Sequence, residues 1–149
     1  KKARGLNYAR KNLIPYFIFD EKNKLEEIKL IQKLKDKKID LICLSGYMRI
    51  LSKNLIKSFR NRIINIHPSL LPKFKGLNTY KRVIRKKEKK TGCTVHFVNE
   101  KLDDGKIILQ KAFYISNKDD ELSLKKKTQK LEYKVFSEAI IKLFNLRIL

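Results

Sequence analysis

Residues 62–68 read RIINIHP, and residues 39–46 read IDLICLSG. Each is a short, nearly continuous apolar run, as expected for a strand buried on both sides of a sheet. The first run ends at Gly46, and the second ends at Pro68, which cannot donate a hydrogen bond to a neighbouring strand. Apolar residues at three-residue intervals between positions 21 and 38 predict an amphipathic helix before them. We therefore expect an α/β fold with a mostly parallel sheet and helices on both faces.

The second half of the chain predicts an antiparallel edge for this sheet. Residues 79–90 are expected to form a helix that ends before Gly92, and residues 94–98 to form a strand. Asp104 and Gly105 mark a turn, after which residues 106–116 should return antiparallel to that strand. The apolar spacing in residues 121–145 predicts a long final helix that packs on the sheet.

Length and composition bound the class of protein. A chain of 149 residues with 42% hydrophobic residues suits one domain. The absence of a long apolar stretch or secretory signal in the sequence predicts a cytoplasmic protein without membrane partners. Cys43 and Cys93 lie far apart and outside any zinc-binding spacing, so we expect reduced, buried thiols and no metal.

The formal net charge of +22 raises the alternative of a basic nucleic-acid-binding domain. Most of this charge comes from lysines spread along the whole chain, whereas phosphate and base recognition favours clustered arginines or ordered aromatic side chains. We therefore expect no nucleic-acid partner. A positive field would still attract a phosphorylated substrate or a folate that carries glutamates.

Asn65 and His67 end the second predicted strand and lie two residues apart, so both side chains point to the same side of the sheet. In open α/β sheets, ligands bind beyond the carboxyl ends of the strands. An amide N–H can stabilise a tetrahedral oxyanion, and an imidazole can transfer a proton to a leaving nitrogen, so the pair fits acyl transfer. A nearby acid would raise the histidine pKa. On spacing alone, a hydrogen-bonded structural histidine is the commoner explanation.

Longer motifs surround this pair. Residues 65–79, NIHPSLLPKFKGLNT, resemble the signature of the phosphoribosylglycinamide formyltransferase family. Residues 44–51, LSGYMRIL, are similar to the family's folate-site segment. Residues 92–98, GCTVHFV, and 102–110, LDDGKIILQ, are similar to its second active-site segment. The resemblance implies a Rossmann-like formyltransferase fold for the whole chain.

The resemblance also implies a set of site residues. Asn65, His67 and Asp103 correspond to the family's catalytic residues, with Asp103 raising the pKa of His67 and ordering a water. The segments expected to bind the folate are Met48, Arg49, Ile50 and Leu51, and the loop residues Asn99, Glu100, Lys101 and Leu102. The residues expected to bind the substrate are Gly46, Asn65, Pro68, Gln129 and Glu132.

Several of these positions have a simpler explanation. Gln129 and Glu132 lie on one helical face, where a pair of solvated side chains is common. His96 matches a position beside the active site, or is a structural histidine. Lys22 or Lys24 corresponds loosely to a cation near the folate, or simply begins a surface helix. Asn78 and Tyr80 stand where many relatives carry histidine, which implies that those histidines do not carry the chemistry.

The implied reaction is transfer of the formyl group of 10-formyltetrahydrofolate to the amine of glycinamide ribonucleotide in purine synthesis, by a monomer or homodimer. The alternatives within the same chemistry are formyltetrahydrofolate deformylase, which uses water as the acceptor, and methionyl-tRNA formyltransferase. The family also begins with a strand, a glycine-rich phosphate loop and a helix, and residues 1–9 resemble the helix after its second strand. We therefore expect residues 1–149 to be a formyltransferase domain without that first segment.

Overall fold

The computed structural model describes residues 4–20 and 22–145, and the chain divides into two compact units between Ile39 and Asp40. The first unit contains α1 (Arg4–Lys11) and α2 (Lys24–Asp36). The side chain of Asn23 caps α2 by accepting hydrogen bonds from the backbone N–H groups of its first turn. The helix predicted between positions 21 and 38 is thus confirmed. Of the predicted helix in residues 1–9, positions 1–3 lie outside the described residues.

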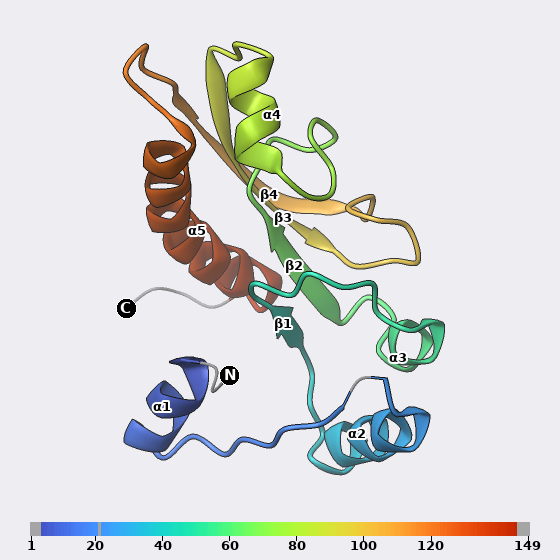
Figure 1. Cartoon of the computed structure of the whole chain (residues 1–149). Coiled ribbons are helices and arrows are strands. Elements are labelled where there is room, and N and C mark those ends of the chain that lie inside the picture. Colours follow the sequence, from blue (N-terminus) through green and yellow to red (C-terminus); the bar gives the residue numbers. More distant parts are fainter. Residues whose placement is uncertain (1–3, 21, 146–149) are drawn as a thin grey trace. The chain divides into compact units, whose positions relative to one another are not determined.

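The second unit is built on a mixed four-stranded sheet in the order β1-β2-β3-β4 (Figure 1). Its strands are β1 (Ile42–Leu44), β2 (Ile63–His67), β3 (Lys90–Phe97) and β4 (Ile107–Tyr114). Strand β1 pairs with β2 in parallel, and the β2–β3 and β3–β4 pairs are antiparallel. The α/β class and the antiparallel edge are confirmed. Strand β3 begins four residues earlier than predicted, so the antiparallel part is longer than the sequence indicated.

Three helices belong to this unit: α3 (Lys53–Ser58), α4 (Thr79–Arg85) and α5 (Glu121–Leu143). The short α3 was not predicted, although the Ser52 hydroxyl caps it by accepting from Leu55 N–H. Helix α4 ends at Arg85 rather than at residue 90, because Lys90 already pairs with Tyr114 in the sheet. No helix in the described residues has both the length and the apolarity to cross a membrane.

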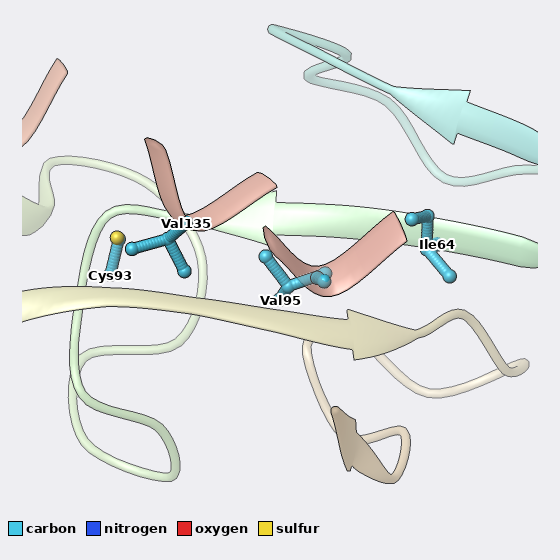
Figure 2. Close-up of a cluster of buried hydrophobic side chains, with 5 residues drawn as sticks. Ile64, Cys93, Val95 and Val135 are labelled. Atoms are coloured by element: carbon cyan, nitrogen blue, oxygen red, sulfur yellow. The ribbon is translucent and has the colours of Figure 1, made fainter. Parts of the chain in front are cut away.

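Alternate residues give the sheet two different faces. Ile64, Cys93 and Val95 are fully buried against Val135 and Ala139 of α5, which runs along one face of the sheet (Figures 1 and 2). Burial raises the pKa of Cys93 to about 12, so its sulfur behaves as a neutral, small apolar group. This face forms the core that fixes the orientation of β2 and β3.

The opposite face carries polar side chains in a cross-strand arrangement. Asn65 lies opposite His96, and His67 lies opposite Thr94, which in turn lies opposite Gln110 of β4. Directly paired residues project to the same face of a sheet. This polar face is therefore formed by β2, β3 and β4 together.

One expectation about a single residue was wrong, and one glycine has a role that the sequence did not indicate. Gly92 lies within β3, where a Cβ would lie 1.9 Å from the Lys111 carbonyl oxygen. Only glycine allows β3 and β4 to approach so closely. Cys43 is exposed rather than buried, because β1 is an edge strand of the described sheet.

Candidate active site

His67 and Asp103 form the centre of the polar face. His67 Nδ1 lies 3.1 Å from Asp103 Oδ2, and both side chains are more than nine-tenths buried. His67 is the last residue of β2, whereas Asp103 lies in the loop between β3 and β4. The two residues that the family resemblance assigned as partners are thus in hydrogen-bond contact.

The loop after β2 contacts both members of this pair. His67 Nε2 lies 2.9 Å from the carbonyl oxygen of Phe74, and Gly76 N–H donates to Asp103 Oδ2 at 2.8 Å. A carbonyl can only accept, so Nε2 carries a proton. The ionised Asp103 carboxylate can also only accept, so its contact with Nδ1 is a hydrogen bond when Nδ1 carries a proton as well, and the carboxylate favours that protonated state. Neither backbone contact can be read from a pattern of side chains, although Gly76 lies within the motif.

Burial lowers the pKa of His67 below its usual value, and the charges of His96 and Arg82 act in the same direction. The Phe74 carbonyl and the Asp103 carboxylate oppose this effect. Asp103 therefore acts in the direction expected from the sequence, but burial outweighs it. That Asp103 keeps the imidazole protonated during the reaction stays a prediction.

Asp103 itself remains an anion. Burial acts to raise its pKa, but the nearby imidazole of His96, the hydrogen bond from Gly76 N–H and the charge of His67 outweigh burial, so the pKa is lowered. Asp103 adopts a left-handed conformation with φ of 47°, which aspartate tolerates better than most residues. Two residues later, a Cβ on Gly105 would lie 1.7 Å from the Phe97 carbonyl oxygen. The turn that presents the acid thus requires glycine at that position.

His96 is a second imidazole at this carboxylate. Its Nε2 lies 3.7 Å from Asp103 Oδ1, and its Nδ1 lies 2.8 Å from the carbonyl oxygen of Phe97. Nε2 is buried without a hydrogen-bond partner among the described residues. His96 is therefore more closely tied to the site than the sequence indicated. Asn65, half-buried, lies directly opposite it on β2.

The two segments expected to bind the folate lie in loops that an ion pair connects. Met48 and Ile50 are exposed in the loop that follows β1, whereas Leu51 is buried. Beyond that loop, Lys53 Nζ lies 3.8 Å from Glu100 Oε2 in the β3–β4 loop. Because β1 and β2 are parallel, their carboxyl ends meet at the same edge, next to His67. The remaining residues of these segments are Arg49, Asn99, Lys101 and Leu102.

The residues expected to bind the substrate are more scattered. Gly46 follows β1 with a positive φ of 68°, and Pro68 directly follows His67. Gln129 is exposed on α5, and Glu132 is half-buried near Tyr80 and Cys93, whose pKa values its charge raises. No contact in the described residues links Gln129 or Glu132 to His67.

Three further candidate positions lie at or just before the starts of helices. Lys22 and Lys24 belong to the first unit, where Lys24 begins α2. Asn78 precedes α4. Among the described residues, no three His, Cys, Asp or Glu side chains are close enough to bind a metal ion.

The arrangement is that of a group-transfer centre at the carboxyl edge of an α/β sheet. A buried imidazole lies between a backbone acceptor and an anionic carboxylate, with an amide on the same face. Such a centre can stabilise an oxyanion and deliver a proton to a leaving group.

Comparisons with known proteins identify the class more closely. Residues 1–140 match the family described as formyl transferase, and the chain belongs to that family. It is 40% identical over 138 residues to the phosphoribosylglycinamide formyltransferase of Haemophilus influenzae, covering 90% of this chain and 65% of that protein. It is 42% identical over 145 residues to the trifunctional purine biosynthetic protein adenosine-3 of Drosophila melanogaster, covering 95% of this chain and 11% of that protein.

A solved structure gives the same result for the fold. The crystal structure of phosphoribosylglycinamide formyltransferase from Bacillus halodurans superposes with a TM-score of 0.88 at 38% identity, covering 96% of this chain and 76% of that one. The Rossmann-like formyltransferase fold implied by the sequence motifs is thereby confirmed.

Proposed function

We propose that the protein transfers the formyl group of 10-formyltetrahydrofolate to the amine of glycinamide ribonucleotide, a step of purine biosynthesis. Family membership and the names of its relatives support this reaction. The observation that carries it is the contact of 3.1 Å between His67 Nδ1 and Asp103 Oδ2 on the polar face of the sheet. This pair supplies the proton transfers that amine formylation requires.

The proposed reaction begins when the amine nitrogen attacks the formyl carbon and forms a tetrahedral intermediate. The Asn65 amide N–H stabilises the negative charge that develops on the formyl oxygen. The positive charge of His67, maintained by the Asp103 carboxylate, stabilises the same oxygen. The bond from carbon to the folate nitrogen then breaks as His67 delivers its proton to that nitrogen, and the proton that the amine loses restores the imidazolium. The products are the formylated amide and tetrahydrofolate.

Asp103 supports this role of His67. Its carboxylate is already ionised, and its contact of 3.1 Å with Nδ1 favours the imidazolium, whereas burial of the ring opposes it. The pair therefore stabilises the charge of the intermediate and supplies the proton to the leaving nitrogen.

The proposal includes the surrounding residues. The folate binds along the loop 48–51 and the loop 99–102, whose exposed apolar side chains suit a flat heterocycle. Gly46, Asn65, Pro68, Gln129 and Glu132 bind the ribonucleotide. We further propose a cytoplasmic monomer or homodimer that acts on these small molecules and has no nucleic-acid partner.

The test is an assay of purified protein with both substrates. Mass spectrometry should detect the formylated ribonucleotide, with tetrahydrofolate formed in equal amount. Replacing His67→Ala should reduce kcat by about 100-fold or more, because proton transfer is lost. The matched control is Val95→Ala, which truncates a buried residue on the opposite face of the same sheet and should retain activity.

Other outcomes would decide against the proposal. Release of formate without a formylated amine would indicate a deformylase. Activity with methionyl-tRNA, and none with the ribonucleotide, would indicate the other formyltransferase. Full activity of His67→Ala would remove the pair from the mechanism.

A further inference from the structure

We propose that Thr94 and Gln110 are positioning residues, which hold the loop 68–76 and through it the His67–Asp103 pair in the reactive arrangement. Neither residue touches the proposed reacting atoms. The expected effect on turnover rests on the proposed function, whereas the expected effect on the pKa of His67 does not.

Thr94 is the point where the loop is attached to the sheet. Its hydroxyl donates to the Ser69 carbonyl at 2.6 Å and accepts from Leu71 N–H at 3.1 Å. It also accepts from Gln110 Nε2 at 2.7 Å. A threonine hydroxyl has one proton and two lone pairs, so these three contacts use its full capacity. Thr94 is fully buried, and its bonds to Ser69 and Leu71 are shielded from water.

Gln110 strengthens the same attachment from β4. Besides its bond to Thr94, Nε2 donates to the Leu71 carbonyl at 3.1 Å. Leu71 therefore has both its N–H and its carbonyl bound by side chains of the sheet. Across the strands, Thr94 pairs with both Gln110 and His67. The two anchoring residues, Thr94 and Gln110, therefore lie in one cross-strand row with His67. Strands hold such groups more accurately than loops do.

The attached loop then reaches both catalytic groups. Three residues after Leu71, the Phe74 carbonyl meets His67 Nε2. Two residues further on, Gly76 N–H donates to Asp103. A displacement at Leu71 would therefore move both the carbonyl that accepts from His67 and the N–H that donates to Asp103.

Packing alone does not fix this loop. A hollow of about 290 Å³ lies beside residues 70–74, lined also by Glu88, Lys90, Thr91 and Gln110. The ion pair between Lys73 and Glu88, at 3.1 Å, also connects the loop to the chain before β3, but Lys73 is largely exposed. Exposed ion pairs contribute little. The Ser69 hydroxyl also binds the Lys73 carbonyl, but that bond lies within the loop, whereas the buried hydrogen bonds of Thr94 join the loop to the sheet.

Removing the anchors should therefore change the state of His67. The Phe74 carbonyl raises the pKa of His67, so its displacement should lower that pKa further. An imidazole that no longer retains its acceptor would also be less well oriented toward the reacting atoms. We expect a lower kcat with a smaller change in KM for the folate, because the hydrogen bonds of Thr94 and Gln110 go to Ser69 and Leu71 rather than to either folate loop.

The experiment compares Thr94→Val, Thr94→Ser and Gln110→Met with the unchanged protein. Valine keeps the shape of threonine and removes the hydroxyl, whereas serine keeps the hydroxyl. The matched control is Thr128→Val, because Thr128 on α5 is fully buried and its hydroxyl has no hydrogen-bond partner among the described residues. The readouts are the titration of His67 in ¹⁵N-histidine NMR spectra, and kcat and KM with the two proposed substrates.

Thr94→Val and Gln110→Met should each lower the pKa of His67 and reduce kcat by about 10-fold or more. Thr94→Ser and Thr128→Val should resemble the unchanged protein in both readouts. If Thr94→Val does not fold, the exposed Gln110 still allows the comparison.

An unchanged His67 titration in Gln110→Met and in any folded Thr94→Val protein would overturn the inference, even if stability falls. It would show that the network only supports the fold. If the unchanged protein transfers no formyl group, the proposed function fails, but the NMR titration still tests the positioning.

Discussion

The two faces of the four-stranded sheet consist of alternate residues of the same strands, but different forces hold them in place. Under α5, Ile64, Cys93 and Val95 contact other apolar side chains and have no exposed surface. On the other face, His67 and Thr94 are fixed by hydrogen bonds to single atoms. Apolar contacts are non-directional and tolerate a change of shape, whereas a hydrogen bond is lost over a fraction of an ångström.

This difference separates stability from activity. A defect under α5 should weaken the fold and leave the geometry of the catalytic pair nearly intact. A defect on the polar face should impair the chemistry before it unfolds the protein. Changing one face at a time should therefore separate the effects on turnover from the effects on stability.

The largest effect is expected for Asp103→Asn. The amide cannot stabilise the His67 imidazolium, so kcat should fall by about 100-fold to 10,000-fold. The pKa of His67 should also fall, because the carboxylate raises it. The neighbouring Asp104→Asn is the matched control, since Asp104 is paired with Lys75 at the surface. A comparable loss of kcat in both variants would contradict a specific role for Asp103.

Ile64→Ala tests the apolar face. Removing a fully buried isoleucine side chain should lower the free energy of unfolding by about 2–5 kcal/mol, measured by denaturant titration. Turnover by the fraction that remains folded should change little. A loss of kcat comparable to that of Asp103→Asn would show that the two faces are not separate.

The pH dependence of stability tests the polar face without any substrate. The pKa of folded His67 lies below 6.5, so the unfolded chain binds a proton first as the pH falls. The contribution of His67 to the free energy of unfolding is therefore present above pH 6.5, and it is lost as the pH falls through the pKa of His67 in the folded protein. Asp103, whose pKa is lowered from 3.8, loses its contribution only in more acidic solution. Denaturant titrations between pH 8 and pH 5 should show the loss of stability that is due to His67, and His67→Gln should reduce that loss.

The smallest effect is expected at the rim of the apolar face. Lys111 of β4 pairs with Glu138 of α5, with 2.5 Å between Lys111 Nζ and Glu138 Oε2 and both side chains partly exposed. Lys111→Met should cost less than about 1 kcal/mol, and the difference should shrink in high salt. A larger, salt-independent loss would mean that the aliphatic part of the lysine contributes through packing.

The sequence allowed much of this architecture to be predicted, because periodicity reports burial directly. The helix at α2, the strand β2 and the long α5 follow from the spacing of their apolar residues. The early start of β3 could not be found in this way. Residues 90–93 pair with β4, and Gly92 is required by the approach of another strand rather than by a local turn.

The candidate site shows the same limit. Strand alternation placed Asn65 beside His67, and the family motifs added Asp103, which the structure brings to His67. The Phe74 carbonyl and Gly76 N–H could not be predicted, because any residue carries these backbone groups. The balance of forces on the His67 pKa was also beyond the sequence, since it depends on how deeply the ring is buried.

The position of Asp103 in the β3–β4 loop also has a consequence for the order of folding. His67 can occupy its strand before β4 is in place, but Asp103 reaches it only from a turn that closes against Phe97. The contact between them can therefore form no earlier than the β3–β4 hairpin. In a refolding experiment, the ¹⁵N signal of His67 would report when the β3–β4 hairpin forms, independently of any probe of the core.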